Sequence, residues 1–194
     1  MLRAFVRAFD AFLRRREGIF EFEARPEEQL FRLQVSRLQR DVKRPDFELP
    51  AGAKILSIHL WNEHVPPIPV EGAELAWGLR VQRMLVASFR AIARQMQSDP
   101  RLAGVTAVHA VTAIFGAHDG SGGEKLMRRM GFFIYPCRRP LGRCGELWEN
   151  AYSWLLMYVF NPVSVRRRQL WRLERSEMWM LAEEFLRRYG APTG

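Results

Sequence analysis

Polar and aromatic side chains between residues 59 and 64 form the densest group in the chain that could do chemistry. They are His59, Trp61, Asn62, Glu63 and His64. A histidine near a glutamate can act as a general base with an orienting partner, so His59, Glu63 and His64 are the candidate catalytic residues. Trp61 and Asn62 are candidate ligand-binding residues. Structural roles explain the same types, because asparagine closes turns, tryptophan packs, and glutamate pairs with an arginine such as Arg80.

The same group raises the question of a metal site. His59 and Glu63 would supply two ligands, and a third would have to come from His109 or His118. His109 lies among small apolar residues in a predicted strand, where a core histidine with one hydrogen bond is the expected role. His118 lies in a glycine-rich turn. We therefore expect no bound metal.

The residues before the group predict the element that positions it. KILSIHLW at residues 54–61 alternates apolar and polar side chains, which predicts a strand. In α/β sheets, ligands tend to bind beyond the carboxyl ends of strands, which makes this the default site. Helical spacing then predicts a helix over residues 73–97 with an arginine stripe at Arg80, Arg83, Arg90 and Arg94. Of these, Arg80 and Arg83 are the candidate ligand-binding residues.

The remaining patterns predict the fold class. Strands are expected at residues 29–36, 105–115 and 132–136, and helices at 1–16, 124–130 and 177–189. Residues 37–53 are expected to form a loop or hairpin return. Strands alternating with helices predict a mixed α/β (α+β) sheet with helices on both faces and an amphipathic helix at each end. We expect residues 1–27 to form an N-terminal helix and connector, and residues 28–194 a single α/β domain.

Composition limits the classes of partner. The chain has 194 residues and a net charge of +9, and only Lys43, Lys54 and Lys125 among its 30 basic residues are lysine. Arginine binds carboxylate and phosphate bidentately, which suits anionic partners, although GC-rich coding or a hot habitat also enriches arginine. We find no helix-turn-helix, RNP or zinc-finger pattern, so sequence-specific nucleic-acid binding is not expected.

Targeting signals and cysteine usage predict a cytoplasmic protein. Arginines interrupt the N-terminal apolar residues, so no signal peptide is indicated. The longest apolar run, residues 154–160, is far below the ~20 residues that cross a bilayer. Cys137 and Cys144 match neither a zinc nor a redox motif and are expected to be reduced thiols. The basic amphipathic helix leaves peripheral membrane contact open, although docking on the same domain is its commoner use.

Four motifs spread over most of residues 28–189 resemble the YkoP-like domain family. They are IHLWNEHVP at 58–66, LAWGLRVQR at 75–83, MGFFIY at 130–135 and RSEMWM at 175–180. This family occurs alone or attached to polysaccharide deacetylases. The resemblance implies a bacterial cell-envelope or sporulation context and no settled activity.

More distantly, the order of predicted elements from residue 54 to 136 is similar to that of GNAT-type acyl-CoA N-acyltransferases. The stretch LMRRMGFFIY also resembles their helix-to-strand ending. This resemblance implies a GNAT-like sheet and acyl-CoA as a cofactor. Those enzymes hold the pyrophosphate of CoA with Q/R-x-x-G-x-G/A, whereas this chain has VPPIPVEG, and prolines lack the amide hydrogens of such a cradle.

Three hypotheses follow. The first is an accessory domain without a cofactor, which binds a small anionic or envelope-related ligand near residues 59–63 and Arg80. The second is an atypical acyl-CoA-dependent acyltransferase with Glu63 or His64 as its base. The third is a peripheral membrane or nucleic-acid interaction protein that acts through its N-terminal helix and basic patches. Whether the protein is an enzyme and what oligomer it forms are left open.

Overall fold

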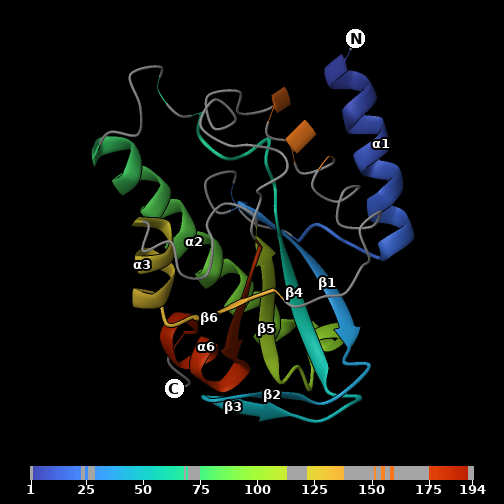
Figure 1. The fold of residues 1–194 in the computed structure, drawn as a ribbon, viewed down its shortest axis with the longest axis vertical. Helices are drawn as coiled ribbons and strands as arrows, with labels where there is room; N and C mark the ends of the chain where they lie inside the picture. Colours follow the sequence, from blue (N-terminus) through green and yellow to red (C-terminus); the bar gives the residue numbers. More distant parts are fainter. Residues whose placement is uncertain are drawn as a thin grey trace.

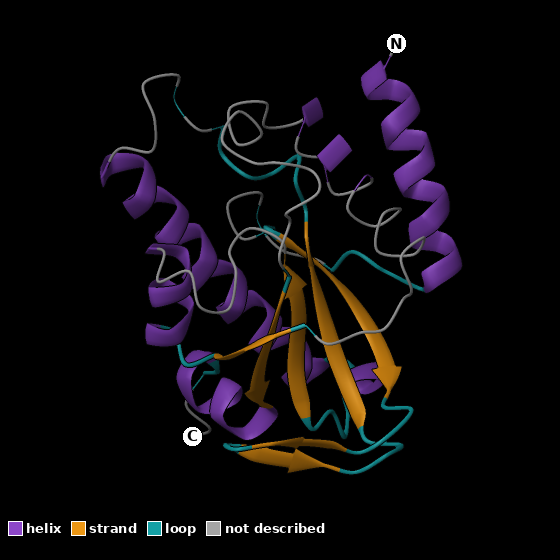
Figure 2. Cartoon of the chain, viewed as in Figure 1, coloured by secondary structure: helices purple, strands orange, loops and turns teal. Residues whose placement is uncertain are grey.

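The computed structural model describes residues 2–22, 25, 29–67, 69, 75–112, 122–137, 151, 154–155, 158–159 and 175–191. The helices with full bounds are α1 (Leu2–Glu17), α2 (Leu75–Ser98), α3 (Gly122–Arg129) and α6 (Ala182–Tyr189), and a short 3-10 helix, η2, spans Pro100–Leu102. The strands are β1 (Phe31–Arg37), β2 (Val42–Arg44), β3 (Phe47–Leu49), β4 (Lys54–Leu60), β5 (Ala107–Thr112), β6 (Phe133–Pro136) and β7 (Ser176–Leu181). Figures 1 and 2 show these elements along the chain and by type.

Five of the strands form one mixed sheet in the order β1-β4-β5-β7-β6, and β2 and β3 form a separate hairpin. β4 and β5 are parallel, and α2 connects them, which confirms the predicted helical crossover. β7 lies between β5 and β6 and is antiparallel to both. The predicted mixed α/β fold class is therefore confirmed.

The C-terminal segment corrects one prediction. Residues 177–189 were expected to be a single helix, but Ser176–Leu181 form β7 and only Ala182–Tyr189 are helical. The first five residues of β7 are buried, because the strand is paired along both edges and covered on both faces. A residue in the middle of a sheet needs an extended backbone to make these bonds, which overrides the helical spacing of the residues that follow.

One face of the sheet packs against the helices. Apolar side chains of β1, β4, β5 and β7 meet α2 and α6 in a single large core. Phe89 of α2 and Phe185 of α6 are completely buried in it. In Figure 1, α2, α3 and α6 are grouped together, whereas α1 stands apart from them beside β1.

The opposite face carries the alternate residues of the same strands. At one end the β2–β3 hairpin covers it with Phe47 and Leu49, which pack with Ile55, Ala107 and Trp179. Figure 2 shows this hairpin lying across the lower end of the sheet. Near the other end, α1 reaches this face through an ion pair between Asp10 and Arg32 of β1. The polar side chains of Ser57, His59 and His109 also lie on this face, because they alternate with the core residues of β4 and β5.

Candidate functional site

The loop after β4 is a hydrogen-bonded turn. The amide of Trp61 donates to the carbonyl of Leu30 at 2.8 Å, and the amide of His64 donates to the carbonyl of Trp61 at 2.9 Å. Asn62 lies within this turn. The turn brings Trp61, Glu63 and His64 together.

Trp61 is the centre of an aromatic and ionic cluster. The His64 ring stacks on the indole with the centroids 3.8 Å apart and the planes 15° apart. The guanidinium carbon of Arg32 lies 4.0 Å from the centroid of the same indole, and the indole N–H donates to Glu63 at 3.3 Å. Such cation–π contacts are worth about 0.5–2 kcal/mol. With two planar groups against it, the indole of Trp61 has little face left for a sugar or base to stack on.

Each of the two histidines of the site forms a hydrogen bond with a residue near or in β1. Nδ1 of His64 lies 2.7 Å from the carbonyl oxygen of Gln29. A carbonyl only accepts, so Nδ1 carries the proton, and in the neutral ring Nε2 keeps the lone pair that a base needs. His59 instead places Nε2 at 3.0 Å from the side-chain oxygen of Gln34 on β1. His59 is thus bonded to Gln34, and Glu63 to Trp61.

A partly buried ion network lies next to Trp61. Arg32, whose side chain is 8% exposed, donates to Asp10 of α1 at 2.9 Å and lies 3.4 Å from Glu21. Arg14 bridges the same two carboxylates at 3.0 and 2.8 Å. Burial and the nearby charge of Arg14 lower the pKa of Arg32, while Asp10 and Glu21 oppose that shift. The two positive and two negative groups compensate one another, so the network can remain in a low-dielectric position.

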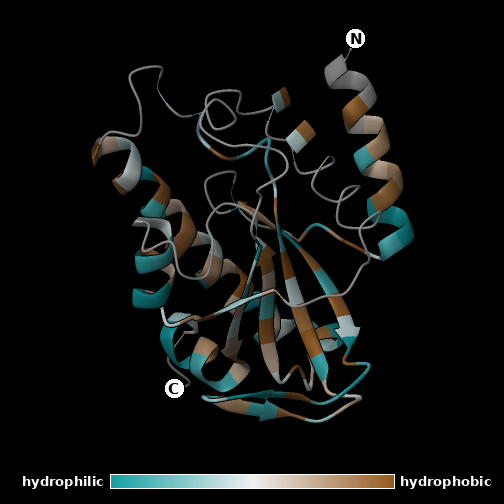
Figure 3. Ribbon diagram, viewed as in Figure 1, coloured by the Kyte–Doolittle hydropathy of each residue, from teal (hydrophilic) through white to brown (hydrophobic). Residues whose placement is uncertain are grey.

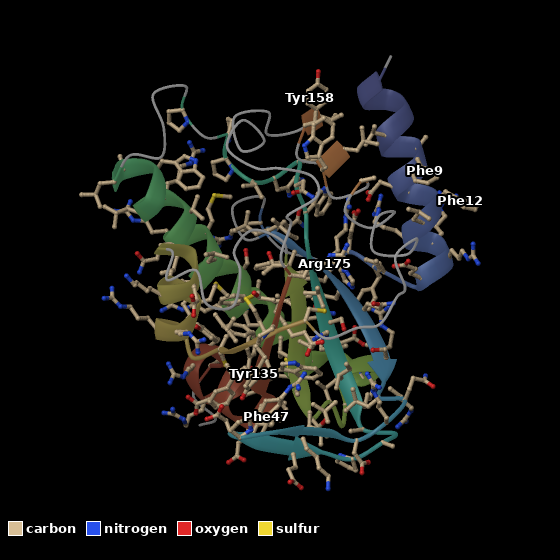
Figure 4. The ribbon with its side chains drawn as sticks, viewed as in Figure 1. Phe9, Phe12, Phe47, Tyr135, Tyr158 and Arg175 are labelled. Atoms are coloured by element: carbon tan, nitrogen blue, oxygen red, sulfur yellow. The ribbon has the colours of Figure 1, made fainter. Side chains whose placement is uncertain are left out.

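The sequence analysis missed Arg32 and Asp10 as members of this cluster. A signal was present, because Asp10 is the only acidic residue among residues 2–16, which include five arginines. A single carboxylate within a basic helix suggests a specific cationic partner on the domain. The helix thus docks on the sheet through Asp10, while Phe12 is 59% exposed and points outward in Figure 4.

Replacing Asp10 by asparagine should loosen α1. The substitution leaves the buried Arg32 without one of its two carboxylates, and we expect a loss of about 1–2 kcal/mol in the free energy of unfolding, less than for a fully buried pair. Hydrogen exchange should become faster in α1 before it does in the sheet. Urea titration and exchange mass spectrometry measure the two effects. Glu48→Gln on the exposed side of β3 is the matched control. Equal losses of unfolding free energy in both variants would contradict the docking of α1 through Asp10.

The two arginines proposed for ligand binding lie on α2. Arg80 and Arg83 are both exposed. The indole N–H of Trp77 donates to the carbonyl of Pro66 at 3.2 Å, which ties the first turns of α2 to the loop that follows Trp61. Arg80 follows Trp77 by one helical turn, whereas Arg83 borders a separate hollow on the outer side of α2.

A second polar cluster lies deeper on the same face of the sheet. Ser57 of β4 and His109 of β5 face each other, with Oγ and Nδ1 3.4 Å apart, and the His109 ring lies against Trp179 with centroids 4.1 Å apart. His109 is 2% exposed, as expected for a core histidine. Glu177 of β7 accepts from the indole N–H of Trp179 at 3.3 Å and from Arg44 of the hairpin at 2.7 Å. Because residues 177–189 were predicted to form a helix, Glu177 was not predicted to be a member of this cluster.

The aromatic residues around Arg44 close this cluster toward the hairpin. Phe47 and Tyr135 lie next to each other in Figure 4, with ring centroids 6.3 Å apart. The Tyr135 hydroxyl donates to Asp46 at 2.5 Å, and burial together with this bond raises the pKa of Tyr135 to about 12. Tyr135 is therefore a neutral donor at any physiological pH. The cluster as a whole ties β7, β6 and the hairpin together.

Hydrogen bonding between β4 and β5 stops early. Their parallel pairing covers only Ile55 to Ser57 and Ala107 to His109, although β4 runs on to Leu60 and β5 to Thr112. Beyond that point β4 stays paired with β1, and β5 stays paired with β7. The hydrogen bonding between the two central parallel strands thus ends three residues before the Trp61 turn.

The described part of the chain holds neither a group of metal-ligating side chains nor a helix able to span a membrane. Among the described residues, no three His, Cys, Asp or Glu side chains are grouped so that they could hold a metal ion. None of the described helices has the length and apolar character needed to cross a membrane. His118 lies outside the described residues, so its predicted place in a turn stays a prediction.

Comparison with known proteins places the chain in a family. No curated protein and no solved structure matches it. The model of the YkoP domain matches residues 19–189, which is most of the chain and includes the Trp61 turn, α2 and β7 but not α1. The chain therefore belongs to the YkoP domain family.

Proposed function

We propose that this protein is an accessory domain that binds a small anionic ligand at the carboxyl ends of β4 and β5. The envelope and polysaccharide context that the resemblance to deacetylase-associated YkoP-like domains implies makes a phosphate- or carboxylate-bearing envelope compound the favoured ligand. The early end of β4–β5 pairing carries the proposal. Ligands of α/β proteins usually bind where neighbouring strands diverge at their carboxyl ends.

The charges near this position support an anionic ligand. α2 contains four arginines and no acidic residue. Its first turns are held beside the loop after Trp61 by the bond from Trp77 to Pro66. The N-terminal end of a helix also carries partial positive charge, which adds to the attraction for an anion. Arg80 is the cation that we propose for the ligand, because Arg83 borders the separate hollow on the outer side of α2.

The Trp61 cluster contributes rigidity in this proposal. Its indole already contacts Arg32 and His64, so we assign Trp61 a positioning role for the turn instead of a stacking role. Asn62 and Glu63 follow it in the turn, where Glu63 is exposed and Asn62 is half-buried. They are the polar side chains placed to contact a bound ligand.

Calorimetry with three anions tests the proposal. Pyrophosphate, glucuronate and acetyl-CoA are titrated into the full chain, and we expect at least one to bind with a dissociation constant of about 1 mM or below. Arg80→Ala should weaken that binding roughly tenfold, because it removes one charge-assisted contact of about 1.4 kcal/mol. Arg129→Ala on α3 removes an exposed arginine away from the site. Absence of heat with all three anions, or equal weakening in both variants, would refute the proposal.

A second function has one specific observation in its favour. The bond from His64 Nδ1 to the Gln29 carbonyl leaves Nε2 of the neutral ring able to accept a proton, as the base of an acyltransferase must. Release of free CoA from acetyl-CoA in the presence of amine acceptors, abolished in His64→Gln, would support that alternative. Binding of acetyl-CoA without CoA release supports the accessory role.

A further inference from the structure

The outer side of α2 carries a regular stripe of residues, most of which are exposed to solvent. Leu75, Leu79, Gln82 and Val86 follow one another at intervals of three or four residues, so they lie along one side of the helix. Leu75 is 81% exposed and Leu79 is 43% exposed, and both are among the few large hydrophobic side chains exposed in the described part of the chain. Figure 3 shows hydrophobic residues reaching the first turn of α2 at the edge of the molecule.

The charge of this helix is of one sign. Arg80, Arg83, Arg90 and Arg94 are all exposed, and the 24 residues of α2 include no aspartate or glutamate. Arg83 and Arg90 flank the stripe and have no ion pair with a described residue. Surface helices usually interleave both signs, which stabilises them by i to i+4 pairs. α2 lacks that compensation, so its outer side attracts negative charge.

A hollow lies on the same side of the helix. It has a volume of about 400 Å³, and its described lining residues are Leu79, Gln82, Arg83, Val86, Ala87 and Arg90. Its described apolar lining residues are Leu79, Val86 and Ala87, and its two arginines are seven residues apart, which is about two helical turns. A space of this size accommodates a few side chains of a partner between two cationic groups.

From this surface we infer that α2 docks an acidic amphipathic helix of a partner protein. Leu75, Leu79, Gln82 and Val86 occupy successive positions of a short helix–helix seam, and Arg83 and Arg90 occupy the flanking positions that form interhelical ion pairs. Apolar side chains of the partner enter the hollow, and its carboxylates pair with the two arginines. This is the helix-in-groove mode of recognition, with anchors one or two turns apart.

Two other occupants fit this surface less well. A second copy of the chain would bring α2 against α2, and four arginines would then face four arginines without a carboxylate between them. An anionic membrane would require a broad apolar face, whereas this stripe is one residue wide and Gln82 interrupts it. The partner surface is separate from the proposed anion site, because Arg90 and Val86 lie well beyond the first turns of α2.

Fluorescence anisotropy with designed peptides tests the inference. The probe is a labelled heptad peptide with leucine at the seam positions and glutamate at the flanking positions, and its counterpart carries lysine in place of glutamate. The full chain should bind the glutamate peptide and not the lysine peptide. Arg83→Glu/Arg90→Glu should bind the glutamate peptide roughly tenfold or more weakly and should gain binding to the lysine peptide, because the charge pairing is reversed.

Controls separate this surface from general charge attraction. Lys125→Glu/Arg129→Glu on the exposed side of α3 changes the net charge equally and should leave peptide binding within about twofold. Leu79→Ser should weaken binding without altering its salt dependence. Circular dichroism spectra and thermal transitions show that each variant is folded. Failure of the glutamate peptide to bind, equal loss in the α3 variant, or binding to phosphatidylglycerol vesicles in place of the peptide would each overturn the inference.

The outcome of the peptide-binding test can be distinguished from the outcome of the anion-binding test. Arg80 is unchanged in the Arg83→Glu/Arg90→Glu variant, and a small anion that binds at the ends of β4 and β5 depends on Arg80. Loss of peptide binding with anion binding retained would support two separate surfaces. Loss of both in this variant would overturn their separation.

Discussion

Replacing Phe89 by alanine is expected to lower the free energy of unfolding by about 4 kcal/mol, the largest effect that we predict for a single substitution. Phe89 is completely buried, and four aromatic rings surround it. It stacks on Phe31 of β1 at 5.5 Å between centroids, and it contacts Phe132, Phe185 and Tyr189 at 5.3, 5.8 and 5.2 Å. Alanine would leave a cavity where α2, α6 and the sheet meet.

Urea unfolding followed by tryptophan fluorescence measures the loss. Phe89→Leu is the matched control, because leucine keeps most of the volume but none of the ring contacts, and we expect it to cost about 1–2 kcal/mol. If Phe89→Ala lowered the free energy of unfolding no more than Phe89→Leu does, the core would be able to collapse around position 89. The aromatic contacts would then not be what holds α2 against the sheet.

The second large effect is expected from Arg44→Met. Glu177 is buried beside His109 and Trp179, and Arg44 donates to it at 2.7 Å. Methionine keeps much of the aliphatic length of arginine but leaves a buried carboxylate without its cation. Breaking a buried pair in this way costs about 3 kcal/mol, toward the lower end of the usual range because the Arg44 side chain is 24% exposed.

This loss should depend on pH in a defined direction. Burial raises the pKa of Glu177, but the hydrogen bonds from Arg44 and Trp179 and the charges of His109 and Arg44 outweigh burial and hold the pKa below the ordinary 4.5. A lowered folded-state pKa stabilises the native protein above about pH 4.5 and loses that effect as the pH falls through the folded-state pKa. Without Arg44, burial dominates and the pKa of Glu177 rises. The difference in stability between the two proteins should therefore be largest near pH 7 and should shrink toward pH 4.5.

A double variant separates the carboxylate from general packing. In Arg44→Met/Glu177→Gln the buried group is neutral, so most of the loss should be recovered and its pH dependence should disappear. Chemical unfolding at several pH values measures both effects. A loss that is the same at pH 7 and pH 4.5 would mean that the charge of Glu177 is not what destabilises the single variant.

Local patterns in the sequence predicted the central part of the fold. The alternation at residues 54–61 and the helical spacing at 73–97 correspond to β4 and α2, and the apolar run from residue 105 contains β5. These elements are long and strongly periodic, and a parallel pair requires a crossover of this length. Residues 61–64 of the polar group after β4 lie in one turn, which brings Trp61, Glu63 and His64 together, and hydrogen bonds to Gln29 and Leu30 hold that turn.

The partners of those residues depend on the tertiary structure. Arg32 contacts Trp61 because β1 pairs with β4. It contacts Asp10, which lies 22 residues earlier in the chain, because α1 docks beside β1. Glu177 meets Arg44 across 133 residues. Ser176–Leu181 became a strand only because β5 and β6 offered hydrogen bonds to both of its edges. Local sequence patterns report on neighbours within about one helical turn, whereas these contacts arise from chain segments that meet only when the sheet has formed.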